Sequence, residues 1–161
     1  MRRAWFLTVV LVLAGWLVPS TSAACSCMWV GPFLKVAPRT HLIVRAKVAN
    51  YHGESRGVRL AMDVEVSEVF KGDAPAKTIR IWGDNGAMCR PYVSGFPVQT
   101  EWIFAVNPLA GRPGEYFISI CGEYWLKAQH GQVSGHLSSF SLSDEKQTMS
   151  LEELRTALKA S

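Results

Sequence analysis

The sequence lacks the familiar signatures of a catalytic site. It contains no G-x-S-x-G nucleophile turn, no H-E-x-x-H zinc motif and no phosphate-binding Walker motif. The four histidines are dispersed and no third metal ligand accompanies the last two: His41, His52, His130 and His136. Charged residues make up only 19% of the chain and hydrophobic residues 48%, which excludes wholesale disorder. We therefore expect a folded protein that is not an enzyme and holds no cofactor or metal of its own.

Long hydrophobic runs are also lacking, with one exception near the start. Residues 4–18 carry no charge, but about 15 residues are too few to span a bilayer as a membrane anchor, which takes about 20. Arg2 and Arg3 precede this run, Pro19 ends it, and small residues follow from position 20 to 24. This is the layout of a secretory signal peptide. We predict a signal peptide over 1–24, a secreted (extracellular or periplasmic) protein without a membrane span, and one domain over 25–161.

The cleavage point has three interpretations. Cleavage after Ala24 has Ser22 three residues before the cut, and cleavage after Ala23 has Thr21 there, so both satisfy the small-residue rule. The sequence before Cys25 also loosely resembles a lipid-attachment signal, although the leucine of such a signal is missing. We favour cleavage that leaves Cys25 first.

The chain has almost no excess of positive charge once the signal peptide is removed. The whole chain has a net charge of +4, but two of its 17 basic residues lie in 1–24, which leaves 15 against 13 acidic residues. A net charge of +2 gives little support to a nucleic-acid partner.

Cysteines are few, yet their positions are informative: Cys25, Cys27, Cys89 and Cys121. An even number in an exported chain favours two disulfides. A bridge between Cys25 and Cys27 would close a strained ring, so the two remaining pairings both tie the N-terminus to two distant points. A thiolate metal site is the alternative, but structural zinc prefers two C-x2-4-C pairs and the sequence has one C-x-C.

The rest of the chain favours β structure. Between residues 58 and 66, apolar side chains alternate with polar ones, which predicts a strand with one buried face. Similar patterns predict five strands in all, over residues 41–48, 58–66, 77–82, 101–106 and 116–120. Ser150 and Glu153 have the spacing of a capping box and predict a terminal helix at about 150–160. We expect an all-β, five-stranded barrel of the OB type with this helix, and a β-sandwich is the alternative.

Several segments resemble the tissue inhibitors of metalloproteinases. Residues 25–27 form the C-[ST]-C triplet with which that family begins, Pro32 follows, and residues 42–47 read LIVRAK, close to its V-I-R-A-K strand. Residues 86–90, 101–105 and 118–123 are similar to later family segments. The resemblance covers about residues 25–126 and implies the family's inhibitory domain, which has the netrin-like (NTR) OB fold.

The resemblance also implies the disulfide pairing and shows departures. It pairs Cys25 with Cys89 and Cys27 with Cys121. The family's third bridge has no counterpart, since Pro38 stands near the place of its first cysteine, and the cysteine-rich C-terminal subdomain is missing. These departures suggest a pared-down, single-domain homologue, which would suit a bacterial source.

The function implied by the resemblance is inhibition of secreted zinc metalloproteases by a monomeric protein. The α-amino nitrogen and carbonyl oxygen of N-terminal Cys25 would chelate the zinc of the protease, and the protease-contacting residues would be Ser26, Cys27, Met28, Trp29, Ala87 and Met88. The alternative is a secreted netrin-like module that binds a matrix or cell-surface partner without inhibition. An OB domain that binds oligonucleotides or sugars is a third interpretation.

Overall fold

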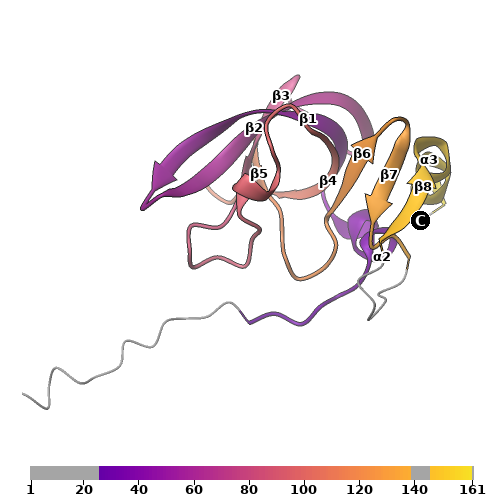
Figure 1. The fold of residues 1–161 in the computed structure, drawn as a ribbon, viewed down its shortest axis with the longest axis horizontal. Helices are drawn as coiled ribbons and strands as arrows, with labels where there is room; N and C mark the ends of the chain where they lie inside the picture. Colours follow the sequence, from indigo (N-terminus) through magenta and orange to yellow (C-terminus); the bar gives the residue numbers. More distant parts are fainter. Residues whose placement is uncertain (1–25, 139–145, 161) are drawn as a thin grey trace, which may run out of the picture.

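The fold is one sheet whose first part closes into a ring. The computed structural model describes residues 26–138 and 146–160 (Figure 1). The strands are β1 (Leu42–Ser55), β2 (Val58–Lys71), β3 (Thr78–Trp82), β4 (Glu101–Pro108), β5 (Glu115–Phe117), β6 (Trp125–Gln129), β7 (Gln132–Gly135) and β8 (Gln147–Ser150). They pair in the order β1-β2-β3-β5-β4-β6-β7-β8, and β1 also pairs with β4. This additional pairing closes a ring of five strands, β1-β2-β3-β5-β4.

The ring encloses the larger of two hydrophobic cores. Alternation along β1 and β2 turns Val44, Val48 and Val64 inward, where all three are fully buried. Phe104 of β4 and Ile81 of β3 complete the same core. β3 and β5 pair in parallel and the other neighbours are antiparallel. The far half of the β1–β2 hairpin projects beyond the ring as an arm (Figure 1).

Strands β6, β7 and β8 continue the sheet beyond the ring, and we call them the sheet extension. A second core lies between this extension and two helices. One face of β6 and β7 carries Leu126, Ala128 and Val133. This face packs with Phe33 of α2 (Phe33–Val36) and with Leu154 of α3 (Leu151–Lys159). Two short 3-10 turns, Ala37–Arg39 and Val93–Gly95, complete the regular structure of the described residues. The opposite face of the sheet extension carries Trp125 together with polar residues such as Lys127 and Ser134.

The predicted strands and helix are present, with changed ends. The five predicted strands become β1 to β5, and the mostly β class with a C-terminal helix is confirmed. The fifth strand ends at Phe117 rather than at residue 120, while β6, β7, β8 and α2 were not predicted. The capping box is formed: the Glu153 amide donates to Ser150 Oγ, and the Ser150 amide donates to the Glu153 carboxylate at 2.9 Å.

Two predictions concern the membrane and the leader. Within the described ranges, no helix has the length and apolar character needed to cross a bilayer. The signal peptide predicted over 1–24 lies outside the described residues.

Candidate functional site

The segment that precedes α2 is extended and bound along its length. Residues 26–30 form no regular structure, but Cys27 is joined to Cys121 by a disulfide, which confirms this predicted bridge. The Val30 amide donates to the Cys121 carbonyl at 2.8 Å. The Glu123 amide donates to the Gly31 carbonyl at 3.0 Å. The N-terminal segment therefore lies along residues 121–123 and is held there by a covalent bond and backbone hydrogen bonds.

Close packing against Gly122 also holds the N-terminal segment in this position. A Cβ at Gly122 would lie 3.0 Å from Val30 Cγ2 and 3.1 Å from the Gly31 carbonyl oxygen, so a side chain there would push the N-terminal segment away. On the other side, the Trp29 ring meets the His136 ring edge to face, with centroids 6.4 Å apart. These contacts fix the direction in which residues 26–30 leave the body of the protein.

A second segment, residues 84–90, is organised around one buried carboxylate. Asp84 Oδ1 accepts hydrogen bonds from the amides of Gly86, Ala87 and Met88, at 2.7, 3.0 and 2.9 Å. Asp84 is only 9% exposed. A buried carboxylate that accepts several amide hydrogen bonds holds the backbone around it in one conformation. Asp84 therefore sets the conformation of the loop that carries Ala87 and Met88.

Both segments lie next to a third, residues 119–121, and the cysteine sulfur atoms of the three segments are close together. The Sγ atoms of Cys27, Cys89 and Cys121 lie within 4.8 Å of one another, and the Ile120 amide donates to the Cys89 carbonyl at 3.2 Å. Such sulfur spacing also occurs in metal sites, but Cys27 and Cys121 are bonded to each other and Cys89 is disulfide-bonded. No thiol among the described cysteines is free to ligate a metal, which favours the disulfide interpretation. The predicted partner of Cys89, Cys25, lies outside the described residues.

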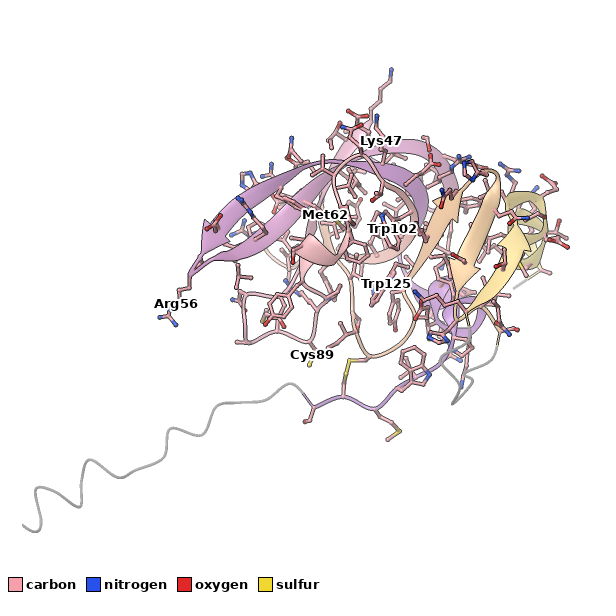
Figure 2. All side chains as sticks on the ribbon, viewed as in Figure 1. Lys47, Arg56, Met62, Cys89, Trp102 and Trp125 are labelled. Carbon is pink, nitrogen blue, oxygen red and sulfur yellow. A yellow bond between two sulfur atoms is a disulfide. The ribbon has the colours of Figure 1, made fainter. Side chains whose placement is uncertain are left out.

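The three segments form one ridge with exposed apolar side chains. We call it the cysteine ridge; it comprises residues 26–30, 87–89 and 120–121. Met28 is 85% exposed, and its apolar neighbours are each about two-fifths exposed: Trp29, Val30, Met88 and Ile120. Figure 2 shows Cys89 at the edge of the molecule, close to the described N-terminal segment. Exposed apolar clusters of this kind are typical of interaction surfaces.

All six predicted contact residues within the described range belong to this ridge. Ser26, Cys27, Met28 and Trp29 lie on the N-terminal segment, and Ala87 and Met88 lie on the loop organised by Asp84. Predicted zinc-chelating Cys25 immediately precedes residue 26 but lies outside the described residues. The sequence analysis missed Val30, Ile120 and Asp84. No local pattern marks the first two, because their exposure follows from how three segments meet.

A half-buried cation, Arg90, follows directly after the loop of the cysteine ridge. The Arg90 guanidinium lies 4.8 Å from the centroid of the Phe117 ring. Burial lowers the pKa of Arg90, and the nearby charge of Asp84 acts in the opposite direction. Arg90 therefore packs its guanidinium against Phe117 of β5, the strand that pairs in parallel with β3.

Comparison of the chain with protein-family models and with curated proteins found no match.

Proposed function

We propose that this protein is a secreted inhibitor of zinc metalloproteases that acts through the N-terminal end of the cysteine ridge. The observation that carries the proposal is the bound, exposed segment that starts at Ser26 and is fixed by the Cys27–Cys121 disulfide. Its resemblance to the tissue inhibitors of metalloproteinases supplies the target class. In this proposal the five-stranded ring is an OB barrel of netrin-like type, and residues 1–24 are removed on export.

The chemistry rests on the first residue of the exported chain. A catalytic zinc has three protein ligands and an open position that holds water. When Cys25 is first, its α-amino nitrogen and its carbonyl oxygen can displace that water as a five-membered chelate. An α-amino group has a pKa near 8, so its deprotonation costs little at neutral pH. The zinc belongs to the protease, and the inhibitor itself holds no metal.

The cysteine ridge lowers the cost of binding. A free N-terminus would lose conformational entropy on entering a protease cleft, whereas residues 27–31 are already held by a disulfide and two backbone hydrogen bonds. Disulfide Cys25–Cys89, if formed as the resemblance implies, extends this restraint to the chelating residue. Ser26 would enter the main specificity pocket, with Met28 and Trp29 along one side of the cleft and Met88 along the other.

The apolar surface of the ridge suits such an interface. A standard protease–inhibitor interface buries about 1,600 Å² in total. Truncating a central anchor of an interface commonly costs about 2 kcal/mol or more. Met28 and Trp29 are the largest exposed apolar side chains next to the proposed chelating end, so they are the anchors that the proposal names.

The decisive experiment compares two extended chains. The exported protein is first checked by intact mass and N-terminal sequencing, which must show an unmodified chain that starts at Cys25. Adding one alanine before Cys25 converts the chelating amine into an amide, so inhibition of a panel of secreted zinc metalloproteases should fall by about 100-fold or more. The matched control adds one alanine after Ser161 and should inhibit like the natural chain.

Three outcomes contradict the proposal. The first is a mature chain that starts at Ala24 or has an acylated Cys25. The second is equal inhibition by the two extended chains. The third is absence of inhibition throughout the panel combined with binding to a matrix or cell-surface protein that Ser26→Gly leaves unchanged, which would favour the non-inhibitory interaction module.

A further inference from the structure

A concave surface lies on the polar side of the sheet extension, next to the cysteine ridge. A hollow of about 370 Å³ is lined by residues of β4, β6 and β7 and by the segments next to them, among them Trp102, Trp125, Lys127 and Glu123. Ligand pockets commonly measure about 300–1,000 Å³. The hollow therefore has room for a small ligand, and none of the cysteine-ridge residues lines it.

Glu123 is the most unusual residue of this hollow. It is only 9% exposed, although it bears a carboxylate. The backbone amide of His136 donates to that carboxylate, and burial raises the pKa of Glu123 against the opposing effect of nearby His136 and Lys146. A Cβ at Gly135 would lie 3.0 Å from Glu123 Oε1 and 2.6 Å from a methyl carbon of Leu126, so glycine makes the room that the carboxylate occupies. Burying a carboxylate costs free energy. Carboxylates that are buried and have a shifted pKa are often found at functional sites.

Aromatic rings form the wall beside this carboxylate. Phe96 meets the rings of Trp102 and Trp125 edge to face, with centroids 5.0 and 5.6 Å away, and the Trp102 Nε1–H donates to Thr100 Oγ1 at 2.7 Å. Figure 2 shows Trp102 and Trp125 next to each other where the ring meets β6. Both indoles are half-buried, so each is rigidly packed and retains exposed surface.

A row of polar side chains extends from this wall across the sheet. Trp102 pairs with Lys127 of β6, Lys127 pairs with Ser134 of β7, and Ser134 pairs with Thr148 of β8. Residues in direct register lie side by side on one face of a sheet. A second hollow of about 190 Å³ shares Lys127 and Ser134 with the first and is lined further by Gln129, Gln132 and Thr148. The two hollows are therefore neighbours on one face of the sheet, and we call them together the groove.

The composition of the groove selects the chemistry of its ligand. Glu123 disfavours an anionic ligand in the first hollow, and Lys127 and Lys146 at its edge disfavour a cationic one. The groove offers acceptors from a carboxylate and amides, donors from ammonium groups and amides, and hydroxyls that do both. Flat indole faces pack against apolar ring surfaces. A neutral sugar ring has hydroxyls at its edge, which donate and accept, and C–H groups on its faces.

We propose that the groove formed by Glu123, Trp102, Trp125, Lys127 and Ser134 binds a neutral oligosaccharide. One sugar ring lies in the larger hollow, where its hydroxyls donate to Glu123 and its C–H face packs against an indole. The next ring lies toward Gln129, Gln132 and Thr148. None of the cysteine-ridge residues lines this groove, although Trp29 of the ridge contacts His136 at the edge of the larger hollow.

The test uses the exported chain and soluble hexasaccharides of defined composition. Cellohexaose, xylohexaose and the hexamer of N-acetylglucosamine are titrated separately, and a heparin hexasaccharide is the anionic comparison. We expect one or more neutral hexasaccharides to bind with a Kd of about 1 mM or tighter, to alter tryptophan fluorescence, and to remain bound when salt is raised, because the contact is not an ion pair.

Matched variants identify the groove. Glu123→Gln preserves shape but removes the charged acceptor, and Lys127→Ala removes an exposed donor; each should weaken binding by about tenfold or more. The controls are Glu54→Gln and Lys77→Ala, which lie outside the groove and should not change the Kd. Circular dichroism checks folding, and if Glu123→Gln is unfolded, Lys127→Ala and Ser134→Ala decide the question.

Three results overturn the proposal. They are absence of binding by all three neutral hexasaccharides up to about 10 mM, binding that the groove variants and the controls weaken equally, and binding of the heparin hexasaccharide alone. The last result would identify an electrostatic surface patch instead of a saccharide groove.

Discussion

Among single residues, Asp84 and Glu123 are two buried carboxylates with different consequences. Asp84 accepts three backbone hydrogen bonds and shapes the loop of the cysteine ridge. Glu123 accepts one from the His136 amide and lines an open hollow. Three backbone amides offset the cost of burying Asp84. The carboxylate of Glu123 has fewer donors inside the protein, so its oxygens can accept hydrogen bonds from a ligand in the hollow. This difference is the reason that we assign Asp84 a positioning role and Glu123 a ligand-binding role.

Replacing Asp84 tests its positioning role. Asp84→Ala leaves the amides of Gly86 and Met88 without their acceptor and the Ala87 amide with Asn85 Oδ1 alone, so we expect the free energy of unfolding to fall by about 1.5–3 kcal/mol in urea denaturation. Inhibition, if the proposed function holds, should weaken as well because Met88 is no longer fixed. Asp84→Asn retains an acceptor oxygen and should lose less. A variant Asp84→Ala with natural stability would contradict this account of the loop.

The raised pKa of Glu123 predicts how stability depends on pH. The folded protein binds a proton on Glu123 at pH values where the unfolded chain has already released it. The free energy of unfolding therefore decreases as the pH rises from the ordinary glutamate pKa through the raised pKa. Glu123→Gln removes this decrease, so its stability relative to the natural chain should be more favourable at neutral pH than at about pH 4. Urea unfolding of both proteins, with Glu54→Gln as the control, measures the effect; parallel pH profiles would contradict it.

At the scale of elements, α3 shows how one helix end is fixed. Its capping box satisfies amides at the start of the helix, and Leu151 and Leu154 pack into the second core. Arg155 reaches Glu68 of β2, with Nε 2.6 Å from Oε1, and lowers the pKa of Glu68 through a hydrogen bond. The helix thereby connects the sheet extension with the ring.

Removing the cap should weaken this connection. Ser150→Ala eliminates the side-chain acceptor for the Glu153 amide, and we expect a loss of about 1 kcal/mol in the free energy of unfolding. The control is Thr156→Ala, inside the same helix, where alanine is a favourable residue and the change should be within about 0.5 kcal/mol. Thermal and urea unfolding measure both variants. Equal losses in the two would show that the capping box contributes little.

For the whole molecule, the Cys27–Cys121 disulfide is the main long-range restraint in the described chain. It joins residues 94 positions apart and fixes the N-terminal segment against the segment between β5 and β6. Besides the bridge, the backbone of residues 26–30 is held by the hydrogen bond from the Val30 amide to the Cys121 carbonyl, and four of these five side chains are apolar or sulfur-containing. Without the bridge, such a terminus would be expected to fray.

The double replacement Cys27→Ser and Cys121→Ser tests this restraint. Removing a native bridge from a small domain typically lowers the free energy of unfolding by about 2–5 kcal/mol. We also expect faster hydrogen exchange at the Val30 amide, whose acceptor is the Cys121 carbonyl. Exchange at Val44 and Phe104 in the first core serves as the reference. Unchanged exchange at Val30 would show that the segment is held in place without this bridge.

The sequence by itself determined the elements with strong local signals. Strict alternation over 58–66 placed β2, the Ser150–Glu153 spacing placed α3, and the cysteine positions excluded a Cys25–Cys27 bridge. The short strands β6, β7 and β8 were not predicted because their alternating patterns are only a few residues long. In β7, for example, Val133 is the only large apolar residue. The predicted strand through residue 120 ended early, since Ile120 hydrogen-bonds to Cys89 and Cys121 enters its disulfide.

Only the tertiary structure decided what these elements form together. Closure of the ring depends on the β1–β4 and β3–β5 pairings, which join segments far apart in the chain and leave no periodic mark on either. The same holds for both sites. Met28, Met88 and Ile120 become neighbours through cysteines, and Glu123 becomes a buried carboxylate because Gly135 leaves it room. Adjacent residues set the secondary-structure preference of a segment. A binding surface is formed by segments that are distant in the sequence and that packing of the core brings together.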